Sequence, residues 1–96
     1  MHDKVIDADD QRATTLDDDD RAQASVLKEV LWMYPEPITL AELTHEMTVG
    51  STEFGEQDRI RRAVRDLIGG GLLYKRDDDL VIPTRAAVRF YVLFEL

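Results

Sequence analysis

The chain has 96 residues, of which 44% are hydrophobic, and this size suits one small globular domain. It contains no cysteine, which excludes disulfide bonds, thiol catalysis and cysteine-ligated zinc. The formal net charge of −8 argues, taken as a whole, against nonspecific attraction to a polyanion. The start of the chain lacks the pattern of a secretory signal, and no apolar run is long enough to cross a bilayer. We therefore expect a soluble, cytoplasmic protein with no membrane contact.

Residues 1–19 are predicted to form an acidic, disordered arm in front of a folded domain of residues 20–96. The first twenty residues contain eight aspartates against Lys4 and Arg12, so this segment alone carries −6. It has few large apolar side chains, and ordering it would bury little surface. The remaining residues hold ten bases and twelve acids, so the domain itself is close to neutral.

The first helix is predicted to begin at Asp20 and to end before Pro35. Asp20 and Gln23 fit a capping box, in which each side chain bonds the other residue's backbone N–H. Proline ends a helix because it lacks the backbone donor and clashes with the preceding turn. The apolar stripe of this helix consists of Ala22, Val26, Leu27, Val30, Leu31 and Tyr34.

A shorter second helix is predicted to follow. Thr39 and Glu42 have the spacing of another capping box, and Gly50 is a natural stop. Its inner face is expected to consist of Leu40, Leu43 and Met47.

The third predicted helix, at about residues 56–68, has one apolar face and one face rich in arginine. Ile60, Val64 and Leu67 recur at spacings of four and three, which places them on one side of a helix. Residues 56–76 hold six bases and three acids, so this segment is basic within an acidic protein. The arginines of the helix are Arg59, Arg61, Arg62 and Arg65.

After three glycines, residues 72–82 predict a β-hairpin, because two short apolar segments flank the acidic turn of residues 77–79. A last helix is then expected from Arg85, capped by Thr84, and it is apolar on two sides. One side carries Ala87, Phe90, Tyr91 and Phe94, and the other carries Val88, Val92 and Leu96. Because one packed face cannot bury both sets, we expect a homodimer through this helix. The predicted dimer interface is Val88, Val92 and Leu96.

This order of elements resembles the winged helix-turn-helix superfamily of small bacterial and archaeal regulators. Residues 38–43 look like its second helix, and residues 59–73 look like its recognition helix with the Gly-Leu-Leu exit. Residues 74–82 match the wing, and residues 84–87 resemble the helix that follows it. The resemblance covers about three quarters of the chain. It implies a mostly helical α+β fold with a three-helix core, a hairpin wing and a C-terminal helix.

In that superfamily the third helix enters the DNA major groove and the wing contacts neighbouring backbone or the minor groove. The resemblance therefore implies a transcriptional regulator that binds double-stranded DNA. Arginine suits such contacts because its planar fork pairs two-pronged with guanine or phosphate. The cations assigned to DNA are Arg59, Arg61, Arg62 and Arg65 on the third helix, with Lys75 and Arg76 on the wing.

Other interpretations stay open. The arginine face can be an ordinary solvated surface, on which Asp58 pairs with Arg62 four residues later. The acidic arm, the acidic wing tip and the hydrophobic last helix favour a winged-helix module that binds protein and makes no direct DNA contact. Twenty acids and few lysines also suit a protein that works in high salt.

The sequence contains no residue pattern typical of a catalytic site. Ser25 and Ser51 lie in no nucleophile-elbow pattern, and His2 and His45 have no partner at metal-ligand spacing. The three glycines end a helix and lack the following lysine of a phosphate loop. We therefore expect a protein that is not an enzyme and that holds no metal or cofactor.

Overall fold

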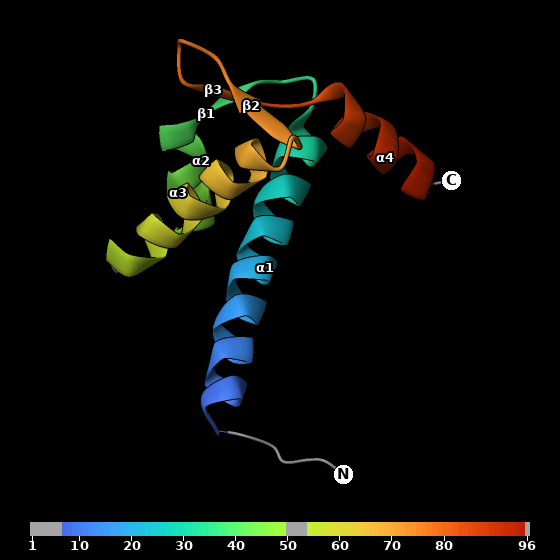
Figure 1. Cartoon of the computed structure of the whole chain (residues 1–96). Helices are drawn as coiled ribbons and strands as arrows, with labels where there is room; N and C mark the ends of the chain where they lie inside the picture. The colour runs from blue at the N-terminus through green and yellow to red at the C-terminus, as the bar shows by residue number, and fades with distance from the viewer. Residues whose placement is uncertain (1–6, 50–53, 96) are drawn as a thin grey trace.

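A computed structural model describes residues 7–49 and 54–95, and the side chains from residue 18 onward except that of Phe54. These residues form a mostly helical α+β fold with a small antiparallel sheet (Figure 1), which confirms the predicted class. The elements are α1 (Asp7–Met33), β1 (Ile38–Thr39), α2 (Leu40–Met47), α3 (Phe54–Gly69), β2 (Leu73–Lys75), β3 (Leu80–Pro83) and α4 (Arg85–Glu95).

The helix α1 begins at Asp7 and not at Asp20, so the predicted start was wrong. Residues 7–19, expected to be disordered, are helical, and α1 passes the expected arm–domain boundary without a break. Residues 1–6 of the predicted arm lie outside the described residues. Aspartates near a helix start favour this extension, because the helix dipole is positive at that end. A helix already nucleated by its packed half also lengthens at low cost. The first half of α1 projects away from the other elements (Figure 1).

The start of α2 is fixed by the predicted capping box. The Glu42 backbone N–H donates to the Thr39 hydroxyl at 3.1 Å, and the Thr39 backbone N–H donates to the Glu42 carboxylate at 3.1 Å. Two buried threonines are satisfied within this segment, since Thr44 donates to the Leu40 carbonyl and Thr48 to the Thr44 carbonyl. The helix ends at Met47, and the predicted stop at residue 50 lies outside the described residues.

The sheet has the strand order β1-β3-β2, and both pairings are antiparallel. The predicted hairpin is formed by β2 and β3, with Lys75 opposite Val81. The two-residue strand β1 was not predicted; it pairs Ile38 with Val81 and so attaches the start of α2 to the hairpin. The hairpin turn contains Asp79 at a φ of 64°, a left-handed conformation that aspartate tolerates better than most residues.

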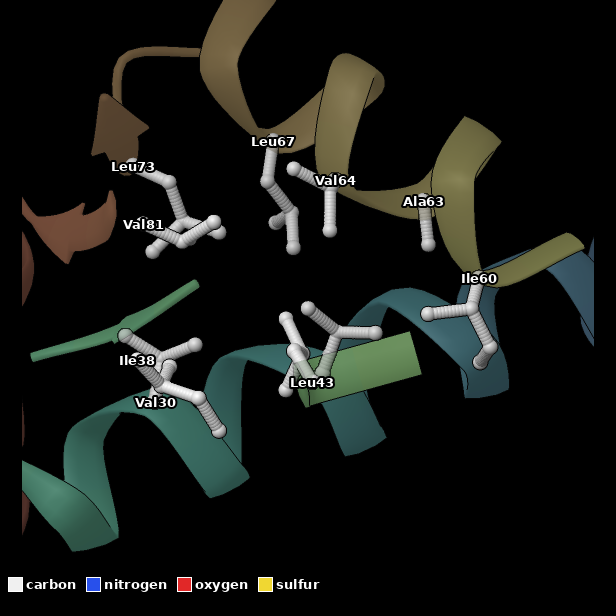
Figure 2. Packing of buried hydrophobic residues seen from close by; sticks show 10 residues of the cluster. Val30, Ile38, Leu43, Ile60, Ala63, Val64, Leu67, Leu73 and Val81 are labelled. Carbon is white, nitrogen blue, oxygen red and sulfur yellow. The ribbon is translucent and has the colours of Figure 1, made fainter. Parts of the chain in front are cut away.

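One core joins α1, α2, α3 and the sheet (Figure 2). The apolar stripe of α3 points inward as predicted, and Leu67 and Val64 face Leu43 of α2. Among the predicted stripe of α1, Val26 and Val30 are buried but Tyr34 is 47% exposed. The buried members of the core are Val26, Val30, Ile38, Leu43, Ile60, Ala63, Val64, Leu67, Leu73 and Val81.

The last helix, α4, is attached mainly through its first turns. The predicted cap forms, because the Thr84 hydroxyl accepts from the Ala87 backbone N–H at 3.2 Å and donates to the Gly71 carbonyl at 2.8 Å. Of the apolar side with four members, Ala87 is buried, whereas Phe90 is 63% and Phe94 is 80% exposed. This side therefore does not pack on the core as a unit, since Tyr91 is only half-buried and lines a groove between α4 and α1.

Candidate nucleic-acid interface

The burial of the apolar stripe sets the rotation of α3 and turns its arginines outward. Ile60, Val64 and Leu67 are almost fully buried against α1, α2 and the sheet. Residues on the opposite side of a helix must then face solvent. All six cations that the superfamily resemblance assigns to DNA are exposed, namely Arg59, Arg61, Arg62, Arg65, Lys75 and Arg76.

Arg61 and Arg65 lie one helical turn apart on α3. Neither makes an ion pair or a side-chain hydrogen bond with any residue that the structure describes. A guanidinium stays charged at any physiological pH, and each of these two presents five N–H donors to solvent. They are the cations of α3 most available to an external anion.

Arg59 and Arg62 lie on the flank of α3 that faces α1. The Arg62 Nε lies 3.9 Å from the Asp58 Oδ2, so the ion pair expected from their spacing forms. Arg59 and Arg62 also line a small groove together with Asp19 of α1. This flank therefore already has carboxylates near its cations, which sets it apart from Arg61 and Arg65.

A further contact fastens the same two helices. The Gln23 Nε2 of α1 donates to the Asp66 Oδ2 of α3 at 3.4 Å. A second groove brings Asp18 of α1 beside Arg59 and Glu56 of α3. Two acids of α1, Asp18 and Asp19, therefore lie along the first half of α3. Periodicity within either helix could not reveal this arrangement, because it depends on how the two helices pack.

The cations of the β2–β3 hairpin are paired with the acids of its own turn. The Lys75 Nζ lies 3.3 Å from the Asp79 Oδ1, and the Arg76 Nη2 lies 3.0 Å from the Asp78 Oδ2. With Asp77, the turn holds three carboxylates against two cations, a formal charge of −1. The hairpin is thus no basic surface, although its sequence contains two bases.

An apolar surface on α4 lies apart from these charges. The rings of Phe90 and Phe94 stack with centroids 5.4 Å apart, and Leu93 is 50% exposed beside them. Of the predicted dimer residues, Val88 is half-buried and Val92 is 44% exposed, while Leu96 lies outside the described residues. The sequence reasoning missed Phe90, Leu93 and Phe94 as a surface set, although their spacing of three and four was a signal for it.

The described residues meet neither the requirements of a metal site nor those of a membrane-spanning helix. Within residues 18–49 and 55–95, no group of three or more acidic or histidine side chains is placed to hold a metal ion. None of the described helices combines the length and the apolar character that spanning a bilayer requires. Comparison with protein-family models, with curated proteins and with solved structures found no match to this chain.

Proposed function

We propose that the chain is a winged helix-turn-helix regulator that binds double-stranded DNA through α3. Three helices, a hairpin and a last helix follow one another in the order typical of that superfamily. In this proposal α2 and α3 form the helix-turn-helix, and β2 and β3 form the wing. The strand β1 fixes the wing to the start of α2.

The observation that carries the proposal is the exposed pair Arg61 and Arg65. The side chains of residues four apart lie on the same face of a helix, about 6 Å apart along its axis. The DNA major groove is wide enough to admit a helix, and arginine pairs with guanine edges or with phosphates. Because no described carboxylate pairs with either arginine, their charge is available to DNA.

The test replaces Arg61 and Arg65 by alanine and measures binding to duplex DNA by fluorescence anisotropy. An arginine that contacts a base edge contributes about 1–3 kcal/mol, so the double variant should bind about 30-fold more weakly or worse if both read bases. The matched control replaces Arg85 and Arg89 of α4, which have the same spacing and are exposed too.

This control removes the same charge without touching α3, so it should change the affinity little. Equal binding by the Arg61/Arg65 variant and the wild type would refute the proposal. A wild type without salt-dependent DNA affinity would refute it as well.

We also propose that the regulator is a homodimer through α4. The stacked pair Phe90 and Phe94, with Leu93, leaves a continuous apolar surface in the single chain, which a second copy would cover. Replacing Phe94 by glutamate should give a monomer in analytical ultracentrifugation. The same change at Val49, which is 72% exposed and lies outside α4, should leave the dimer intact. A wild-type chain that sediments as a monomer at high concentration would refute this part.

A second candidate is a winged-helix module that binds protein and makes no direct DNA contact. The formal charge of −1 on the hairpin turn favours it, as does the apolar surface of α4. In this alternative, Arg61 and Arg65 would meet an acidic protein surface. Immobilised wild type would then retain a protein that the Arg61/Arg65 variant loses, and neither form would bind DNA.

A further inference from the structure

We infer that Asp78 and Asp79 keep the β2–β3 hairpin away from the DNA backbone, so that α3 makes the DNA contacts without help from the wing. This inference rests on the proposed function, and it names the residues that limit how much of the surface DNA can use. The superfamily resemblance assigns Lys75 and Arg76 to phosphate. Under this inference, neither residue contributes to DNA binding in the wild type.

The two aspartates are held in position by the backbone of the turn. The Arg76 N–H donates to the Leu80 carbonyl at 2.9 Å, and the Asp79 N–H donates to the Arg76 carbonyl at 2.9 Å. The left-handed conformation of Asp79 turns the chain back toward β2, where its carboxylate meets Lys75. The Asp79 carbonyl also accepts from the Leu40 N–H of α2 at 3.0 Å. These backbone contacts fix the path of the turn, so the negative charge of Asp78 and Asp79 stays within the hairpin even if an ion pair opens.

The net charge of the hairpin turn opposes the approach of a phosphate more strongly than the two ion pairs do. Each pair is about half exposed, and such a pair contributes only about 0–1 kcal/mol, so a phosphate could displace it. Displacement would nevertheless leave three carboxylates close to the phosphate against two cations. The net charge of −1 makes that approach unfavourable. The outer face of α3 has no such opposition, since Arg61 and Arg65 lack paired acids among the described residues.

The experiment replaces both aspartates by asparagine and measures duplex binding across a salt series. Asparagine keeps the size of the side chain and tolerates the left-handed conformation at position 79. If Lys75 and Arg76 then reach phosphates, the slope of log K against log salt should steepen by about 1.8 per protomer. Between 50 and 200 mM salt, the variant should lose about 12-fold more affinity per protomer than the wild type.

Two controls separate freed cations from a general change in charge. Replacing Glu36 and Glu95 by glutamine removes the same two charges at exposed positions outside the hairpin, and it should not steepen the slope. Adding Lys75→Ala and Arg76→Ala to the Asp78/Asp79 variant should return the slope to that of the wild type. Thermal unfolding of each variant checks that the hairpin remains folded.

The outcomes distinguish this inference from the proposed function. It is overturned if Lys75→Ala/Arg76→Ala in the wild-type background already weakens DNA binding. A slope in the aspartate variant no steeper than in the glutamate control also overturns it. Both results leave DNA binding through α3 intact. Binding that appears only after the aspartates are replaced would refute the proposed function, and it would also overturn this inference, which assigns the wild-type DNA contacts to α3.

Discussion

Replacing Leu43 by alanine should cost this fold a large part of its stability. Leu43 is 0% exposed and lies in α2, where it packs in the core against α1 and α3 (Figure 2). A buried leucine that becomes alanine loses transfer energy and leaves a cavity, at a cost of about 3–5 kcal/mol. A domain of this length is stable by only about 5–14 kcal/mol. The melting temperature should fall by about 4 °C or more for each kcal/mol, and so by at least about 12 °C.

Circular dichroism during heating measures this change, and urea unfolding gives the free energy. The control is Trp32→Ala, which removes a larger side chain from the same fold at a position that is 77% exposed. Burial and not size should set the cost, so Trp32→Ala should change stability by less than about 1 kcal/mol. If both variants lowered the melting temperature equally, Leu43 could not lie at the centre of the core.

Three further predictions concern caps, charge and turn geometry. Thr39→Ala should lower the free energy of unfolding in urea by about 1 kcal/mol through loss of the α2 cap, and Thr39→Ser should restore it. Burial, followed by the hydrogen bond and charge of Glu46, raises the pKa of Glu29. The stability that this proton contributes is present below the ordinary glutamate range and is lost as pH rises through the raised pKa. Glu29→Gln should flatten that decline in urea titrations at several pH values, and an unchanged profile would contradict the assignment. In thermal unfolding, Asp79→Val should lower the free energy of unfolding by about 1–2 kcal/mol, because a branched side chain resists positive φ. Asp79→Asn should lower it little, and equal losses in the two variants would contradict a left-handed conformation at residue 79.

The elements that the sequence predicted well are those with a local cause. The capping box at Thr39 and the spacing of Ile60, Val64 and Leu67 place α2 and the inner face of α3 without any tertiary information. The strand β1 could not be found in this way. It has two residues, and its partner Val81 lies more than forty positions along the chain. The early start of α1 was missed because aspartate-rich composition favours disorder, while the same aspartates suit a helix start.

The candidate site, too, was predictable only where the cause is local. Periodicity placed the arginines of α3 on the solvent side, since that side lies opposite the buried stripe. It could not tell that Asp19 and Arg59 line one groove, because that groove lies between two helices. The pairing of Lys75 with Asp79 was equally hidden, because it depends on the left-handed turn at residue 79. Charges counted along a sequence therefore do not show which cations already have a carboxylate partner in the fold.

The most direct measurement is the salt dependence of duplex DNA binding by the wild-type chain, because the slope of log K against log salt counts the phosphates that protein cations neutralise. Contacts by Arg61 and Arg65 alone predict a slope of about −1.8 per protomer. A slope near zero would contradict DNA binding through α3. A slope near about −5.4 would mean that all six assigned cations reach phosphate, and it would contradict the restriction of the contacts to Arg61 and Arg65.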